Sequence, residues 1–292
     1  MLKNILCVCT LSCLIFCSCQ KELSFENNSN GNPGGGNTGG NSNGDLLVKT
    51  VSQSSSGTAS TDYEYDPSKR LISITIKGTR QGVDLGSVMN IRRNTSGIIT
   101  RIVQRSALLA QSGFDSTVTD VYYDAASSRY AYSITQVSMF GISVIDSMPL
   151  IYDASGKVIA LEDWLTNAGS GPAVQVVSKF EYEYGANGNI TSMSAFSVDP
   201  NTNSLQKITT YIRGFDDKLN PLHLMNDAFV LGNPDYYSTN NVISYQINDL
   251  IRGTAIVSLN TSYTYNSFNK PAAGVSTQNP GNIISNLKLY YN

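Results

Sequence analysis

The sequence has no cysteine after residue 19, and this absence limits how its folded part can be held together. All five cysteines lie near the start of the chain, at Cys7, Cys9, Cys13, Cys17 and Cys19. An exported domain stapled by disulfides would carry cysteines in its folded region. We therefore expect a domain without disulfides that depends on its hydrophobic core.

Histidine, tryptophan and charge are also scarce. His223 is the only histidine, which excludes a multi-histidine zinc or iron site, so we expect no metal and no cofactor. Charged residues make up 14% of the chain, the formal net charge is −2, and no basic stripe is present. A nucleic-acid partner is therefore not expected. Seventeen tyrosines, with many small polar residues, favour strands and turns.

The N-terminus has the features of an export signal. Lys3 provides a positive charge, and an apolar run over residues 5–16 follows, too short to span a bilayer stably. Its end resembles a bacterial lipobox, because the small Ser18 precedes Cys19. We expect residues 1–18 to be removed and Cys19 to be lipidated, which would anchor the protein to a membrane without spanning it. An ordinary signal peptide cut nearby is the alternative.

A low-complexity segment follows the signal. Residues 27–44 contain only Asn, Ser, Gly, Pro and Thr, which cannot bury enough apolar area to offset the entropy of ordering. We interpret residues 19–45 as a flexible tether with an r.m.s. reach of roughly 25–30 Å. Residues 46–292 are then a single domain.

A hairpin unit repeats through this domain. In "YEYDPSKRLISITI", Asp66 and Pro67 have the chemistry of a turn, and the residues from 71 to 76 alternate as in a strand. Similar units follow, and the position before each turn residue is 65, 93, 123, 152, 184, 215 and 265. The gaps are 28, 30, 29, 32, 31 and 50, so the period is about 30 residues. The long last gap indicates a degenerate unit or an insertion.

Short connections force neighbouring strands to be antiparallel. The sequence thus predicts an all-β fold, a long up-and-down meander of roughly 12–16 strands built from hairpin units of about 30 residues. A sheet of that size tends to close, so we expect a barrel or half-barrel. In "VQVVSKFEYEY" (174–184) the charged face could line a pore and the apolar face meet lipid, but other strands have no apolar face.

Two stretches depart from the repeat. Residues 221–241 lack alternation, and 221–229 could form a short helix with Leu222, Met225 and Phe229 on one face. We expect this stretch to plug an end of the sheet. Residues 269–282 read as a Pro/Gly-rich loop before a final strand over 283–291.

The signal, the tether and the Tyr-Asp turn units resemble a family of uncharacterised Bacteroidetes-type lipoproteins. That resemblance implies a porin-like fold and no assigned activity or catalytic residues. "YEYDPSKRL" and "IYDASGKVI" also resemble, more weakly, the YD repeats of Rhs-type toxin shells.

Few residues suggest chemistry. The turn aspartates could in principle hold calcium, but each stands alone in its own turn, so we interpret them as turn caps: Asp66, Asp124, Asp153 and Asp216. The carboxylate pairs are adjacent in a strand or lie on one solvated face, which does not suit a glycosidase: Glu162–Asp163, Asp216–Asp217 and Glu181/Glu183. No catalytic residue is expected.

Binding is the remaining possibility. Trp164, Tyr236 and Tyr237 are aromatic residues that could stack on a sugar or contact a protein, although packing in the core or at an edge would also account for them. We expect a non-enzymatic, lipid-anchored β scaffold of the cell envelope, at the outer membrane, with a glycan or protein ligand. An enzyme acting on envelope polysaccharide and a pore-forming barrel are the alternatives.

Overall fold

The computed structural model describes residues 46–80, 82–111, 113–114, 116–139, 142–167 and 175–292, and in this part of the chain seventeen strands form one antiparallel sheet. The expected signal, the tether and Cys19 lie outside the described residues. The strands are β1 (Leu47–Ser54), β2 (Gly57–Tyr65), β3 (Leu71–Arg80), β4 (Val83–Asp84), β5 (Ser87–Arg93), β6 (Ile99–Ser106), β7 (Thr117–Asp124), β8 (Arg129–Met139), β9 (Ile142–Tyr152), β10 (Val158–Asn167), β11 (Gln175–Tyr184), β12 (Ile190–Val198), β13 (Leu205–Leu219), β14 (Asn240–Asp249), β15 (Thr254–Tyr265), β16 (Pro271–Asn279) and β17 (Ile283–Tyr291).

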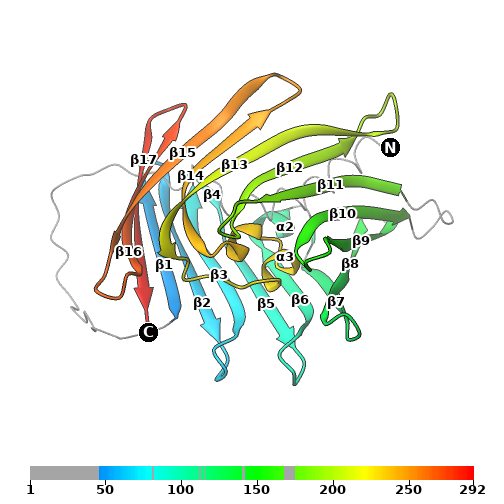
Figure 1. Ribbon diagram of the computed structural model, residues 1–292, viewed down its shortest axis with the longest axis horizontal. Helices are drawn as coiled ribbons and strands as arrows, with labels where there is room; N and C mark the ends of the chain where they lie inside the picture. Colours follow the sequence, from blue (N-terminus) through cyan, green and yellow to red (C-terminus); the bar gives the residue numbers. More distant parts are fainter. Residues whose placement is uncertain (1–45, 81, 112, 115, 140–141, 168–174) are drawn as a thin grey trace.

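The sheet closes on itself (Figure 1). β1 pairs with β2 and also with β17, so sixteen strands form a ring, while the two-residue β4 pairs with β3 alone. Closure pairs every edge strand, which removes the exposed edges of an open sheet. This confirms the predicted meander and its barrel.

Five hairpins use the same turn. In each turn, the amide of the first residue donates to the carbonyl of the residue four positions later. The amide of the residue three positions later donates to the carbonyl of the first residue. The turns begin at Asp66, Asn94, Asp153, Gly185 and Asn266. The residue three positions on has positive φ, as in Lys69 (61°), Gly97 (87°) and Asn269 (58°). This three-residue loop suits the twist of paired strands.

Turn side chains cap these bends as the sequence predicted. Asp153 Oδ1 accepts from the amides of Ser155 (2.8 Å) and Lys157 (2.9 Å). Asp124 Oδ1 accepts from the amide of Ala126 (2.9 Å). Hydrogen bonds from the hydroxyls of Ser127 and Ser155, followed by those from the turn amides, hold the pKa of the Asp124 and Asp153 carboxyls below the usual range.

The tyrosine before the turn also has a repeated structural role. The hydroxyl of Tyr65 donates to the carbonyl of Leu47 (2.9 Å), and that of Tyr152 donates to the carbonyl of Tyr130 (2.7 Å). The hydroxyl of Tyr184 donates to the carbonyl of Val158, and that of Tyr291, at the end of β17, donates to the carbonyl of Pro271. The motif therefore builds the fold.

Three predicted details are wrong. Asp216 is not in a turn: β13 runs through it to Leu219, because the hairpin is opened there by residues 220–239. The predicted helix over 221–229 is only α3 (Asp227–Val230), and Met225 is exposed with a φ of 51°. Most of the predicted loop over 269–282 is strand β16, whose backbone pairs with β15 and with β17.

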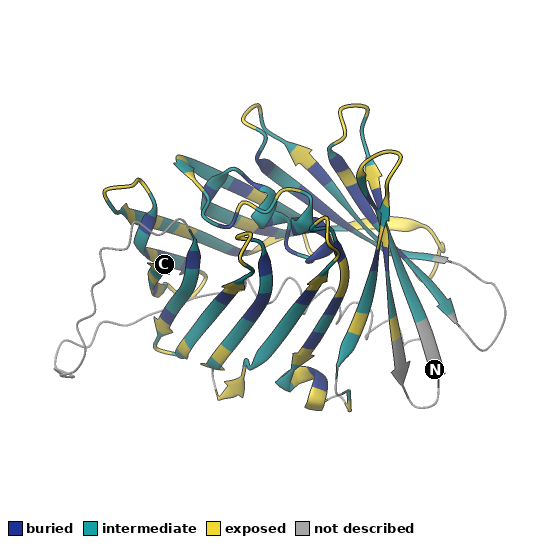
Figure 2. Cartoon of the chain, turned by 90° about the horizontal axis from the view of Figure 1, so that it is seen from below, coloured by how far each residue is buried: buried dark blue, intermediate teal, exposed yellow. Residues whose placement is uncertain are grey.

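Residues 220–239, which we call the plug, lie inside the ring of strands (Figure 1). They contain α3 and a short 3₁₀ helix, η1 (Pro234–Tyr237); a separate helix, α2 (Ala107–Gln111), follows β6. Leu222, Phe229 and Leu231 of the plug are buried in one hydrophobic cluster with residues from β1 to β12. Figure 2 shows these buried segments gathered around the plug, with the hairpin loops exposed. The expectation that this stretch plugs an end of the sheet is confirmed.

Candidate functional site

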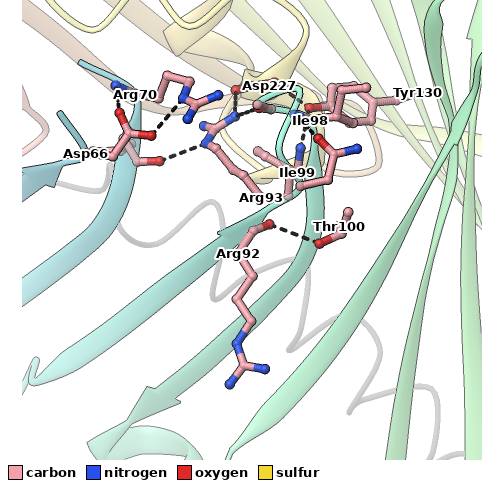
Figure 3. Close-up of polar contacts among 12 residues, drawn as sticks. Asp66, Arg70, Arg92, Arg93, Ile98, Ile99, Thr100, Tyr130 and Asp227 are labelled. Atoms are coloured by element: carbon pink, nitrogen blue, oxygen red, sulfur yellow. Dashed lines mark hydrogen bonds and ion pairs between the residues drawn. The ribbon is translucent and has the colours of Figure 1, made fainter. Parts of the chain in front are cut away.

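The plug is tied to one wall by a charged side chain on β5. Arg93 Nη1 donates to Asp227 Oδ2 (2.7 Å), and the Tyr130 hydroxyl donates to Asp227 Oδ1 (2.6 Å) (Figure 3). The Arg93 side chain is only 7% exposed, so this ion pair is shielded from water. Buried charges persist only when paired in this way.

A second ion pair ties the plug to the opposite wall. Arg213 of β13 pairs with Asp235 of η1, and their side chains are 2% and 8% exposed. β5 and β13 stand eight places apart in the ring of sixteen strands. The plug therefore crosses the interior from one wall to the other.

Aromatic packing fills the space between these ties. The Phe229 ring lies 5.1 Å from both Tyr182 and Tyr237, and Tyr237 lies 5.6 Å from Tyr184. His223 lies 6.3 Å from Tyr237. These contacts show that Tyr182 and Tyr184 of β11 face inward.

The three aromatics suggested by the sequence are not brought together. Tyr236 and Tyr237 pack against the core within the plug. Trp164 lies on β10, half-buried, on the outward face that it shares with Glu162, whose Oε2 accepts its indole N–H (3.1 Å). Ligand binding at these residues stays a prediction.

The inner wall away from the plug has a different character. Alternation along each strand places mainly hydroxyl and amide side chains on it. Neighbouring strands link some of them, as in Thr119 with Thr135 (2.7 Å) and Thr261 with Ser276 (2.6 Å). Most keep part of their surface accessible, and the set comprises Ser52, Thr61, Ser87, Gln104, Thr119, Thr135, Ser178, Ser197, Thr209, Thr261, Ser276 and Gln278.

Two acidic side chains lie within this polar wall. Asp146 of β9 and Asp163 of β10 hydrogen-bond to each other, and Ser178 Oγ donates to Asp163 Oδ2 (2.9 Å). Burial, followed by the charge of Asp163, raises the pKa of Asp146 to about 8. Burial raises the pKa of Asp163 as well, so the pair favours keeping a proton between the two carboxyls. A directly bonded pair is too close for the two separated acids of a glycosidase.

Sequence patterns did not reveal this pair. Asp163 was considered only with its neighbour Glu162, which the structure places on the opposite face. The two aspartates are brought together by the register of β9 against β10. Leu165 of β10 is opposite Asp146 of β9, and Asp163 lies two residues before Leu165 on the same face, so it is the diagonal neighbour of Asp146. Two aspartates at inward positions of consecutive strands were the available signal.

The outer wall carries charge. Asp62 lies between Lys49 and Lys77, at 3.1 Å from each ammonium group, and Lys179 lies 2.9 Å from Glu181. In β11 the charged face is therefore outward and the apolar face inward, the reverse of the arrangement that a lipid-facing strand requires.

Two further observations concern the described part of the chain. It contains no group of three or more side chains of the types His, Cys, Asp and Glu that could hold a metal ion. No helix among these residues is long and apolar enough to cross a membrane.

Comparison with known proteins identifies the fold. A porin-like protein from Bacteroides vulgatus ATCC 8482 matches with 9% identity and a TM-score of 0.50, and one from Bacteroides uniformis ATCC 8492 matches with 10% identity and a TM-score of 0.51. Each match covers 85% of this chain and 98% of the other. No family model and no curated protein matches the sequence. The chain thus has a porin-like barrel fold, while its resemblance to a lipoprotein family and to YD repeats stays a prediction.

Proposed function

We propose that this chain is a non-enzymatic, lipid-anchored barrel of the cell envelope that binds a neutral polar ligand, a glycan in the first instance, on its inner wall. The observation that carries this proposal is the difference between the apolar, plugged end of the barrel and the polar remainder of its inner wall. One end is filled by the plug and its apolar contacts, while the other part of the inner wall presents hydroxyl and amide groups. Such groups are suited to hydrogen bonding with sugar hydroxyls.

The charged outer wall supports a barrel that sits beside a membrane. A lipid-spanning barrel needs a continuous apolar outer band, and an ion at the bilayer midplane costs about 2–4 kcal/mol. Here Asp62, Lys77, Lys179 and Glu181 occupy outward positions within strands. Anchoring through Cys19 supplies membrane attachment without such a band.

A screen of a glycan array with residues 46–292, which contain the whole closed sheet, tests the ligand class. We expect one or more neutral oligosaccharides to bind. Gln104→Leu and Thr135→Val, both on the inner wall, should weaken that binding at least about tenfold. Thr277→Val is the matched control, because Thr277 faces outward on β16. Binding to no glycan, or equal binding by all three variants, would refute the proposal.

Fractionation of cells tests the anchor separately. Cys19→Ala should move the protein out of the membrane fraction and leave an unprocessed precursor, whereas Cys17→Ala should remain membrane-bound. If Cys19→Ala is still processed and stays with the membrane, the lipid-anchor proposal is wrong.

A pore is the second candidate, favoured by the porin-like fold of the two structural neighbours. The plug argues against it, because ion pairs hold this segment across the interior. Addition of the purified protein to a planar lipid bilayer should give no conductance steps. Reproducible steps from the intact protein would favour the pore.

A further inference from the structure

One row of polar side chains continues across eight consecutive strands of the inner wall. Its first half lies on β6–β9 and comprises Gln104, Thr119, Thr135 and Asp146. Thr135 of β8 stands directly opposite Thr119 of β7 on one side and Asp146 of β9 on the other. Gln104 of β6 is the diagonal neighbour of Thr119, because it stands opposite Thr117 on the same face of β7. This half therefore presents amide, hydroxyl and carboxyl groups side by side.

The second half of the row lies on β10–β13. Asp163 stands opposite Ser178, and Ser178 stands opposite Ser197. Ser197 in turn stands opposite Gln206, the second residue of β13. We call the eight side chains of the two halves the polar belt.

The two halves of the polar belt meet at the carboxyl pair of β9 and β10. Leu165 is the residue directly opposite Asp146, and the hydrogen bond between Asp146 and Asp163 carries the belt past it. The Oδ1 atoms of both carboxyls are buried and have no hydrogen-bond partner among the described residues. Asp163 is only 3% exposed, and a buried carboxyl oxygen without a donor is costly. Because Asp146 is half-buried and faces the interior, a ligand hydroxyl can supply the missing donor.

Apolar residues interrupt the polar rows on the other half of the ring. Ile76 stands between Thr61 and Ser87, and Leu259 stands opposite Gln278. The polar belt passes from β6 to β13 without such a break. It spans seven strand spacings of about 4.8 Å, roughly 34 Å in all. A ligand that contacts the whole belt is therefore a chain of several units rather than a single sugar.

An apolar strip lies beside the polar belt on the side of the plug. Phe180 is two residues from Ser178 on β11 and stands between Leu161 of β10 and Ala195 of β12. Its ring is half-buried against the hydrophobic cluster. A sugar ring has hydroxyl edges and an apolar face, so an aromatic side chain beside hydrogen-bonding groups suits it.

The polar belt ends at a pocket on the open rim. The pocket has a volume of about 330 Å³, and residues from the β12–β13 and β14–β15 hairpins line it. Ser197 and Gln206 belong both to the belt and to the pocket, and Pro200 and Ile251 add apolar surface. Gln206 and Ile251 are exposed to solvent, so the belt is accessible from this end.

We propose that the polar belt binds one neutral oligosaccharide chain along its length, with the carboxyl pair as the central anchor and the rim pocket holding one end. This binding mode rests on the proposed glycan-binding function and adds its site and the chain length of the ligand. Neighbouring hydroxyls of one sugar unit donate to the two free Oδ1 atoms. The units on either side hydrogen-bond with the hydroxyl and amide groups of the belt.

The charges of the polar belt favour a neutral chain over an anionic one. Its ionisable side chains are Asp146 and Asp163. On the described parts of β6–β13, no lysine or arginine occupies the inward positions from the belt to the open rim. A uronate or phosphate group would therefore meet carboxyls without a cation to pair with.

Chain length separates this binding mode from a site for a single sugar. The full-length protein is titrated with neutral oligosaccharides of two, four and eight units from the α-glucan, β-glucan, xylan and chitin series. An oligogalacturonate of eight units is the anionic probe. In a series that binds, eight units should bind at least about tenfold more tightly than two. The oligogalacturonate should bind more weakly than the neutral chain of the same length.

Substitutions at the two ends and at the centre of the polar belt locate the chain. Gln104→Leu and Gln206→Leu, seven strands apart, should each weaken binding of eight units at least about tenfold. Both should leave the binding of two units, seated at the carboxyl pair, unchanged. Asp163→Asn keeps the shape of the anchor but removes an acceptor oxygen, and should weaken both lengths. The controls are Thr61→Val, on the inner wall of β2, and Gln246→Leu, on the outer face of β14; they should change neither.

The outcomes separate the polar belt from the function on which it rests. Binding of no neutral oligosaccharide would overturn both. Equal affinity for two and eight units, or undiminished binding of eight units by Gln206→Leu, would overturn the belt and leave a glycan site elsewhere on the inner wall. Gln206 is exposed at the rim, so this variant tests the belt even if Asp163→Asn fails to fold. Tighter binding of the oligogalacturonate than of every neutral chain would overturn the choice of a neutral ligand.

Discussion

At the residue scale, the aspartate pair gives the barrel a specific pH response. The unfolded carboxyl of Asp146 ionises near 3.8, whereas in the fold burial and Asp163 raise its pKa to about 8. Between these values the folded state binds more protons than the unfolded state, so stability falls as pH rises from about 4 to about 8. The stabilisation that protonated Asp146 contributes to the folded state is thus complete below about pH 4 and lost above about pH 8.

Asp146→Asn should remove this dependence. The amide can still donate to Asp163 and carries no charge, so the variant should be more stable than the parent at pH 8, by roughly 1–3 kcal/mol. Urea unfolding at pH 5 and pH 8 measures the difference. Asp153→Asn, in an exposed turn where the carboxyl pKa is lowered, should leave the pH 5–8 slope unchanged. An unchanged slope in Asp146→Asn would show that the pair does not share a proton.

A second residue-scale prediction concerns close backbone approach at Gly78. Its φ is 132°, and a Cβ there would lie 2.1 Å from the carbonyl oxygen of Thr58 in β2. Gly78→Ala should therefore destabilise the protein by about 3 kcal/mol or more, because two paired strands must move apart. Gly156→Ala has positive φ but open space, and should cost only about 1–2 kcal/mol. Equal costs in thermal unfolding would contradict the steric explanation.

At the scale of elements, the plug depends on two buried ion pairs. Asp235→Ala removes the carboxylate partner of Arg213 in a site shielded from water, and should destabilise the protein by about 3–5 kcal/mol. Asp217→Ala is the control, because its pair with Lys218 is exposed and worth about 0–1 kcal/mol. Chemical unfolding measures both. A cost below about 1 kcal/mol for Asp235→Ala would mean that the plug is held mainly by its apolar contacts.

The tyrosine ladder is a second device at this scale. Tyr152→Phe removes one hydroxyl that bonds a strand-end carbonyl, and should cost about 0.5–1.5 kcal/mol. Tyr65→Phe, on a distant hairpin, should cost a similar amount, and the two should add. Tyr122→Phe, whose ring is exposed on the outer wall, should be nearly neutral. Equal effects for Tyr122 and Tyr152 in thermal unfolding would argue against the ladder.

These elements also show what local sequence can predict. The hairpin repeat was predictable from the turn chemistry of Asp66, Asn94 and Asp153, because turns depend on short-range signals. The plug lies in the 50-residue gap between the last two repeat positions, where those signals are interrupted. The strand over Pro271–Asn279 was missed because its proline and glycine resemble a loop; pairing on both sides overrides that propensity. The Asp146–Asp163 pair depends on register between strands, which periodicity alone does not determine.

At the scale of the whole molecule, closure through the terminal strands predicts tolerance to a new pair of chain ends. A circular permutant that opens the exposed loop at Asn201 and joins residue 292 to residue 46 through a short linker should fold with nearly unchanged thermal stability. Deletion of β17 should instead expose the edges of β1 and β16 and cause aggregation. Size-exclusion chromatography and thermal unfolding distinguish the two. An aggregated permutant would show that chain order is needed for closure.

The seam between the two terminal strands also sets a direction. The amide of Asn292 donates to the carbonyl of Leu46 (3.2 Å), and the tyrosine of β17, Tyr291, belongs to the hydrophobic cluster at the plugged end. The described chain therefore starts at the plugged rim. If Cys19 carries the lipid, a tether of roughly 25–30 Å leads from that rim to the bilayer. The plugged end is then the end that the tether joins to the bilayer, and the polar inner wall opens at the other end of the barrel.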